Sequence, residues 1–260
     1  MAQVAVATLV ATGLPTAASG VAAATTGNPD AAAVATTYAR SRPGRVGFVL
    51  RDTQGHVLAS LRPHRTVWSA SVIKSLFVVA YARMARDRNF EPWERRLLRP
   101  MITRSDDAAA GTVRDLLGTQ RVTALGRHAD LRDFRYHPRG WGRSRISPAD
   151  MSTLFLRLPE LIPPRHRAWV MRLFRSITPR QRWGIPPALP PGFRWYVKGG
   201  WLDGVVNQAG LLESGGRRFA LAVLISGTPD TETLVQHHPG HASGTRTITG
   251  VTRRLLAGIR

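Results

Sequence analysis

The sequence predicts an α/β fold with an all-α lobe, in which an antiparallel sheet is flanked by N- and C-terminal helices and a helical lobe is inserted. Two short β segments form a hairpin pattern within residues 45–63, and three more follow one another within residues 193–227. The intervening residues 90–190 carry only helical periodicity. Strands from both ends of the chain around a helical middle indicate one sheet-containing lobe and one inserted helical lobe.

The first predicted elements are a helix and a hairpin. Residues 30–42 are rich in alanine with apolar residues at helical spacing, and Pro43 ends the pattern. Two β segments follow at residues 45–52 and 56–63. The short connection between them contains Gly55, which can take the positive φ that hairpin turns need.

A helix buried on nearly all sides is predicted next, within WSASVIKSLFVVAY at residues 68–81. Apolar residues recur with the helical period and others fill the remaining sides. Four further helical segments are expected in the middle of the chain, because each carries spaced apolar residues and no β pattern interrupts them. They are PWERRLLRPMI, SDDAAAGTVRDLLG, SPADMSTLFLRLPELI and PRHRAWVMRLFRSI.

The character of the sequence changes after the proline-rich stretch IPPALPPG. Residues 193–201, 204–214 and 217–227 are rich in β-forming residues and are separated by turn residues, so we expect three consecutive strands. A final helix is predicted over residues 247–259, where apolar residues fall on one face.

These elements predict one domain over residues 28–260, with an α/β lobe at 28–68 and 190–260 and a helical lobe at 69–189. Residues 1–27 contain no charged residue and consist largely of alanine, valine and threonine. This resembles a secretory signal, so we expect an exported protein, secreted or held in the cell envelope. A disordered alanine-rich lead is the alternative. The absence of cysteine excludes disulfides and cysteine-based metal sites.

The formal net charge of +21 draws attention to anionic partners. The arginines are spread at fairly even density from Arg40 to Arg260, with no long basic run and no recognisable nucleic-acid motif. A generally arginine-biased composition with solvated charges explains this best, and attraction to an anionic cell-wall polymer is the second interpretation. No nucleic-acid partner is expected.

Lysine is rare enough in this chain to be informative. The 37 basic residues comprise 35 arginines and two lysines, Lys74 and Lys198. Ser71 and Lys74 stand at i and i+3, so their side chains share one face of the predicted helix. A serine becomes a nucleophile when a neighbour takes its proton; a lysine of lowered pKa can do so, whereas arginine stays protonated. Lys198 lies in YVKGGW, where two glycines permit close approach of a ligand or another backbone.

Between the two lysines, Ser105, Asp106 and Asp107 open a predicted helix. One interpretation is purely structural, because serine and aspartate are common N-caps. The other is chemical, since these side chains would stand near a serine and lysine pair. The tripeptide alone does not decide between them.

The order S-V-I-K, S-D-D, K-G-G resembles the penicillin-recognising serine hydrolases and is most similar to class A β-lactamases. The similarity spans residues 30–260. It implies that Ser71 is the acylated nucleophile, that Lys74 activates it, and that Ser105 relays a proton to the leaving nitrogen. It also implies that Lys198 raises the local positive potential and holds a substrate carboxylate.

The resemblance implies an oxyanion hole as well, built from two backbone N–H groups. One belongs to Ser71 and the other to a residue two or three beyond Lys198, near Gly200 or Trp201. We therefore expect Ser71, Lys74 and Ser105 to be catalytic, and Asp107, Lys198, Gly200 and Trp201 to bind substrate.

Three departures from the family pattern limit the expectation. Asp107 replaces an asparagine, so an amide that can donate a hydrogen bond becomes a carboxylate that only accepts when ionised. Gly199 replaces a hydroxyl residue and removes one donor to a substrate carboxylate. The short distance in sequence from Ser71 to Ser105 implies a trimmed helical lobe.

The fourth departure concerns deacylation, for which class A β-lactamases use a glutamate in a loop before the K-T-G strand. The corresponding residues 130–151 contain none. Asp133 or His137 could replace it, but a surface salt bridge or hydrogen bond is the favoured interpretation for both. We therefore expect slow deacylation. The five glutamates of the chain are Glu91, Glu94, Glu160, Glu213 and Glu232.

Other chemistries find little support. The eight histidines show no metal-ligand spacing, and no phosphate-binding or dinucleotide motif occurs, so no metal and no cofactor is expected. Trp68 and Trp201 could line the predicted cleft, although core packing explains each at least as well.

Two functions of different classes remain. The first is an exported, monomeric serine hydrolase that forms an acyl-serine with a β-lactam or a peptidoglycan-derived peptide. The second is a catalytically impaired relative that binds the anionic cell envelope through its positive charge.

Overall fold

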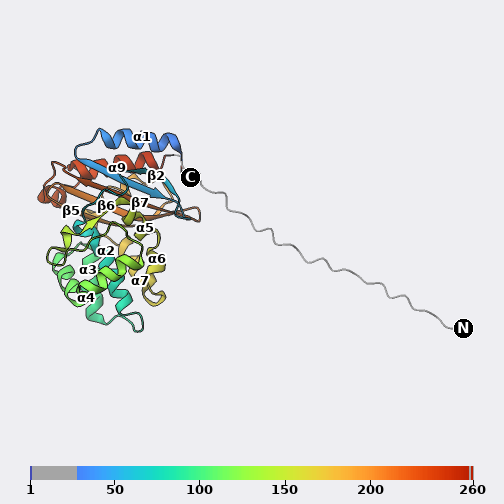
Figure 1. Cartoon of the computed structure of the whole chain (residues 1–260), viewed down its shortest axis with the longest axis vertical. Coiled ribbons are helices and arrows are strands. Elements are labelled where there is room, and N and C mark those ends of the chain that lie inside the picture. Colours follow the sequence, from blue (N-terminus) through green and yellow to red (C-terminus); the bar gives the residue numbers. More distant parts are fainter. Residues whose placement is uncertain (2–27, 258, 260) are drawn as a thin grey trace.

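The computed structural model describes Met1, residues 28–257 and Ile259. The expected leader over residues 1–27 therefore lies, apart from Met1, outside the described residues. Figure 1 shows a sheet with α1 (Pro29–Arg40) and α9 (Ser243–Leu255) on one side and a group of helices on the other. The predicted α/β fold with an antiparallel sheet, terminal helices and a helical lobe is confirmed.

The main sheet has five antiparallel strands in the order β2-β1-β7-β6-β5. The glycine pair Gly215 and Gly216 supplies the positive φ angles of 55° and 75° that join β6 to β7 in a tight hairpin. β5 stands at one edge of the sheet. The strands are β1 (Arg45–Arg51), β2 (Val57–Leu61), β5 (Arg194–Leu202), β6 (Val205–Ser214) and β7 (Arg217–Ser226).

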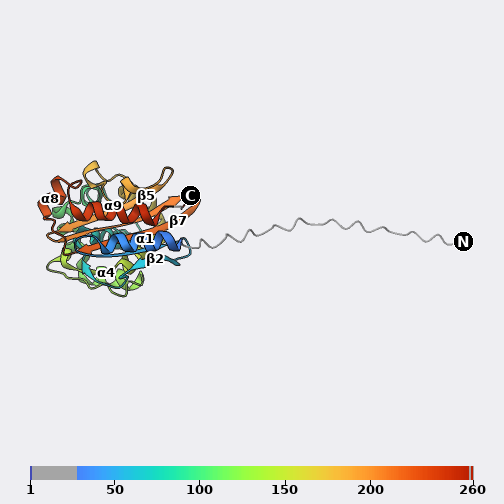
Figure 2. The same ribbon diagram turned by 90° about the horizontal axis from the view of Figure 1, so that it is seen from above.

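The terminal helices cover one face of this sheet and lie side by side, as Figure 2 shows from above. Their contact is close because the helices use small residues: a side chain at Gly250 of α9 would collide with the ring of Tyr38 of α1. Ala35 and Ala39 on α1 and Val251 on α9 are buried against the sheet. Burial of this apolar face supplies most of the stability of both helices.

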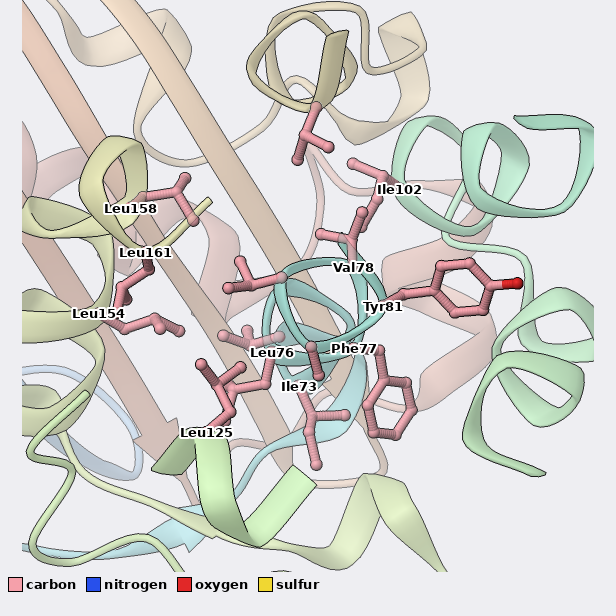
Figure 3. Packing of buried hydrophobic residues seen from close by; sticks show 14 of the residues in the cluster. Ile73, Leu76, Phe77, Val78, Tyr81, Ile102, Leu125, Leu154, Leu158 and Leu161 are labelled. Carbon is pink, nitrogen blue, oxygen red and sulfur yellow. The ribbon is translucent and has the colours of Figure 1, made fainter. Parts of the chain in front are cut away.

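The helical lobe surrounds α2 (Lys74–Met84), which is buried on nearly all sides as the sequence predicts. Figure 3 looks along α2 and shows Ile73, Leu76, Phe77, Val78 and Tyr81 pointing outward in different directions into the core. A helix with apolar residues all round needs neighbours on every side. The surrounding helices are α3 (Pro92–Thr103), α4 (Asp107–His128), α5 (Pro148–Leu156), α6 (Leu158–Leu161) and α7 (Pro164–Arg175).

Two elements differ from the sequence prediction. The helical middle does contain a strand, β4 (Arg145–Ile146), which pairs with β3 (Val67–Trp68) in a small second sheet. Two residues are too few to show any periodicity, so the prediction of an uninterrupted helical middle was wrong here. A short helix, α8 (Glu232–His237), also precedes the last helix, in a part of the chain for which no element was predicted. Within the described ranges, no helix has the length and apolar character that a membrane span requires.

Candidate active site

A cavity of about 500 Å³ opens between the edge strand β5 and the helical lobe. Six segments that are distant in sequence contribute to it. They are a 3₁₀ turn (Ala70–Ile73), the junction of α3 and α4, residues 139–143, the turn near residues 178–181, the end of β5, and α8. Its walls include Ser71, Arg104, Ser105, Asp107, Arg139, Trp141, Arg143, Arg180, Trp201, Glu232 and Gln236.

Ser71 lies on the 3₁₀ turn that leads into α2, rather than inside a regular helix. Ser69 anchors this turn, because its amide donates to Ser144 O at 2.7 Å and its hydroxyl is 3.2 Å from the carbonyl oxygens of Trp141 and Gly142. Ala70 adopts a φ of 46°, which is unusual for a residue with a side chain. Such backbone strain is retained where the surrounding structure fixes it, and it is frequent at functional sites.

The β5 backbone lies directly against Ser71. A Cβ atom built on Gly200 would be 2.4 Å from the Ser71 nitrogen and 2.7 Å from the Val72 nitrogen. Only glycine permits this approach, since the obstructing atoms are backbone and cannot rotate away. The close approach that the two glycines after Lys198 predict is therefore present, and its partner is the backbone at Ser71.

The hydroxyl of Ser105 is shared by both lysines. Lys198 Nζ lies 2.8 Å from Ser105 Oγ, and Lys74 Nζ lies 3.3 Å from the same atom. Lys74 Nζ also donates to the Ser105 carbonyl at 2.6 Å and to a carboxylate oxygen of Asp107. No hydrogen bond joins Ser71 Oγ to Lys74 among the described residues. The structure thus brings the two lysines together on Ser105, beside the turn that carries Ser71.

Both ammonium groups are buried, which changes their acid-base chemistry. Lys74 is 0% and Lys198 1% exposed. Burial lowers the pKa of Lys74, and the neighbouring Asp107 carboxylate partly offsets this effect. Burial also lowers the pKa of Lys198 well below its usual value, and the positive charge of Lys74 lowers it further. A lysine whose pKa is lowered is deprotonated more readily and can then accept a proton.

At the start of α4, Asp106 has the structural role of the N-cap, whereas Ser105 and Asp107 face the lysines. Asp106 is the N-cap, because its Oδ1 accepts from the amide of Ala109 at 2.9 Å. Ser105 takes no part in the cap; it adopts a φ of 60° and turns its hydroxyl toward the lysines. Capping by Asp106 therefore leaves Ser105 and Asp107 available to the cavity.

Gly199 is explained by packing on the other side of β5. A Cβ atom there would be 2.5 Å from Cζ2 and 2.7 Å from Cη2 of Trp183. Trp183 is 6% exposed and packs edge-on against Trp201, with 6.0 Å between ring centroids. The indole fills the space that a side chain at position 199 would need, and it thereby supports Trp201, which lines the cavity.

Several residues considered from sequence lie outside the cavity wall. Asp133 pairs with His64 at 2.9 Å, in agreement with a surface interaction, and the His137 ring accepts from the amide of Gly140. Trp68 does not line the cavity and stacks with arginine side chains instead. In the described part of the chain, no group of three or more histidine, aspartate or glutamate residues is arranged to hold a metal ion.

Sequence reasoning missed several wall residues, among them Trp141 and Glu232. Trp141 lies with its ring centroid 5.0 Å from Lys74 Nζ, in cation–π contact. Glu232 lines the cavity from α8, although it is far in sequence from the other site residues. The N-cap of α8, Thr231, was the one local signal for this helix, and nothing in the sequence pointed to its position against β5.

Comparison with known proteins agrees with this architecture. Residues 93–257 match the family described as the Beta-lactamase enzyme family, a range that begins after Ser71 and Lys74. No curated protein matches the chain.

Solved structures share the fold, and three of them serve as examples. A β-lactamase from Sphaerobacter thermophilus DSM 20745 is 20% identical, with a TM-score of 0.71 over 88% of this chain and 96% of that chain. A protein described as PBP-A is 19% identical, with a TM-score of 0.74 over 89% and 96%. A β-lactamase from Desulfarculus baarsii DSM 2075 is 19% identical, with a TM-score of 0.73 over 88% and 97%.

Proposed function

The chain belongs to the β-lactamase enzyme family, and on this basis we propose that it is a serine hydrolase whose Ser71 forms an acyl-enzyme with β-lactam or peptidoglycan-like amides. The observation that carries the proposal is the Ser105 hydroxyl, held by Lys74 and Lys198 beside the turn that bears Ser71. A relay hydroxyl between two buried lysines of lowered pKa is suited to moving a proton.

In the proposed acylation, Ser71 Oγ attacks the amide carbonyl carbon and loses its proton to Lys74, in its neutral form. The C–N bond then breaks, and the leaving nitrogen receives a proton through Ser105. Lys198 stabilises the negative charge that develops on the Ser105 oxygen and attracts an anionic group of the substrate. The lowered pKa of Lys74 supports its role as the base, and the hydrogen bond between Lys198 Nζ and Ser105 Oγ supports the role of Lys198 as a donor to that oxygen.

We place the oxyanion hole between the 3₁₀ turn (Ala70–Ile73) and β5. The Ser71 amide faces the backbone of Gly200 so closely that no side chain fits between them. At this junction, a substrate carbonyl oxygen would accept hydrogen bonds from the backbone N–H of Ser71 and from that of Gly200 or Trp201. Two such donors stabilise the oxyanion of a tetrahedral intermediate.

Deacylation is proposed to be slow. Of residues 130–151, only residues 139–143 contribute to the cavity wall. This segment contains two arginines and no carboxylate. A general base for the hydrolytic water must be within hydrogen-bond reach of it. Without a base on this wall, the acyl-enzyme is expected to persist for longer than it takes to form.

Labelling with a fluorescent penicillin tests the proposal. We expect one covalent label on the wild-type protein and none on Ser71→Ala, while Ser176→Ala, an exposed serine outside the cavity, labels like the wild type. Slow release of the label and slow nitrocefin hydrolysis are expected in the same samples. Equal labelling of Ser71→Ala and wild type would disprove the assignment of the nucleophile. We further propose that the enzyme acts as an exported monomer.

A further inference from the structure

We propose that the acyl part of the preferred substrate carries a primary amine, and that this amine lies between the carboxylates of Asp107 and Glu232. The inference names the substrate class of the site described above and therefore rests on the proposed function. It concerns two acidic residues on the wall of a cavity whose other charged wall residues are arginines.

Asp107 offers the substrate an acceptor and no donor. One of its carboxylate oxygens is held by Lys74, while its side chain as a whole is 69% exposed within the cavity wall. An ionised carboxylate can accept hydrogen bonds and cannot donate them. A substrate group that meets the free oxygen must therefore supply an N–H or O–H, and a charged amine makes the strongest such bond.

Glu232 extends the same acceptor surface from another segment. It stands on α8 one helical turn before Gln236, and both residues line the cavity. Its backbone amide donates to Asp203 Oδ1 at 2.7 Å, which fixes the start of the helix. Within the described ranges, the side-chain carboxylate forms no ion pair and is available to a ligand.

The electrostatic surroundings of Glu232 favour a cation. Burial raises the pKa of Glu232, and the charges of Asp107 and Asp203 raise it further. An ammonium group near Glu232 and Asp107 would relieve this repulsion, because opposite charges favour the ionised forms of both partners.

The arginines give the substrate a second requirement. Arg104, Arg139, Arg143 and Arg180 border the same cavity, and they suit carboxylate groups. A cavity with carboxylates on one part of its wall and arginines on others matches a zwitterionic acyl donor, such as a peptide-like amide that carries both an amine and carboxylates.

Two penicillins that differ by one amine test the inference. Ampicillin carries a primary amine on its side chain and benzylpenicillin lacks it. We expect Ser71 acylation, followed by intact mass, to be about fivefold faster with ampicillin, which is the scale of one partly exposed ion pair. Glu232→Gln and Asp107→Asn should each reduce this ratio toward one. Glu160→Gln, which changes the charge equally at an exposed ion pair with Arg218, should leave the ratio unchanged.

The outcomes separate the inference from the proposed function. If neither penicillin acylates Ser71, the proposed function fails. If both acylate at equal rates in the wild type, or if the ratio is unchanged in Glu232→Gln and Asp107→Asn, the serine hydrolase stands and the amine site is refuted. Because each variant is judged by a ratio of two substrates, a general loss of activity through Lys74 does not imitate the expected result.

Discussion

Replacing Gly200 with alanine would force β5 away from Ser71. The new Cβ would be 2.4 Å from the Ser71 nitrogen, whereas ordinary contacts begin at 3.4 Å, so the two backbones must separate by about 1 Å. Overpacking of this kind costs about 1–3 kcal/mol in the free energy of unfolding. A displacement of about 1 Å at reacting groups can reduce a rate about 100-fold. We therefore expect Gly200→Ala to fold with reduced stability and to acylate about 100-fold more slowly.

Gly199→Ala is the matched control for this prediction. Its Cβ would collide with the indole of Trp183 on the other side of β5, so the stability cost should be similar. The obstruction does not involve Ser71, and acylation should fall much less than in Gly200→Ala. Urea unfolding would give the two stabilities and stopped-flow labelling with a fluorescent penicillin the two rates. A Gly200→Ala protein that acylates at the wild-type rate would refute the role assigned to the β5 contact.

Three further predictions follow from buried ionisable groups. The acylation rate should rise with pH through a pKa below 10.5 as Lys74 loses its proton. Asp107→Asn should move this inflection to lower pH, because the Asp107 carboxylate raises the pKa of Lys74. An unchanged inflection would contradict the role of Lys74 as the base. The pKa of Glu94 is lowered to about 2, chiefly by its hydrogen bonds from Arg88, so its ionised form should stabilise the fold above pH 4.5 by about 2–3 kcal/mol and lose this contribution between pH 4.5 and 2. Glu94→Gln lacks this contribution to the free energy of unfolding, and its acid unfolding should therefore begin at a higher pH than that of the wild type. Identical acid unfolding of the two proteins would contradict this. Burial raises the pKa of Asp150 to about 6, so the folded protein is less stable when this carboxyl is ionised. Asp150→Asn should therefore raise the free energy of unfolding, measured in urea, by about 2–3 kcal/mol at pH 8 and by little near pH 4. A loss of stability at pH 8 would contradict the burial argument.

The elements with a strong local pattern were predictable from sequence. The hairpin of β1 and β2, the strands β5 to β7 and the buried helix α2 each carry periodicity and turn residues over enough positions to be recognised. The pair β3 and β4 was not predictable, because each strand has two residues and is defined by its partner alone. Its register ties Val67 to Ile146, just ahead of the turn that carries Ser71.

The candidate site was predictable where chemistry and rarity coincide. Lys74 and Lys198 stood out because lysine is scarce, and the structure brings both to Ser105. Trp141 and Glu232 were not predictable, because their places on the cavity wall depend on how residues 139–143 and α8 pack against distant segments.

Gly199 shows a compensation that no local sequence pattern reveals. In the sequence, Gly199 stands where the family pattern has a residue with a hydroxyl side chain. In three dimensions its space is filled by Trp183, sixteen positions earlier in the sequence, whose indole would collide with any larger residue there. In a packed core, a large residue can fill the space left by a small residue that faces it. The reason for the small residue is therefore found only when both residues are seen in the structure.

An intact-mass time course with benzylpenicillin tests the central claim most directly, because it reports formation and loss of the acyl-enzyme together. The account predicts a mass increase equal to one intact penicillin, located on Ser71 by peptide mapping, that forms faster than it disappears and is absent from Ser71→Ala. An adduct at another residue, or no adduct on a protein that is folded by circular dichroism, would contradict it.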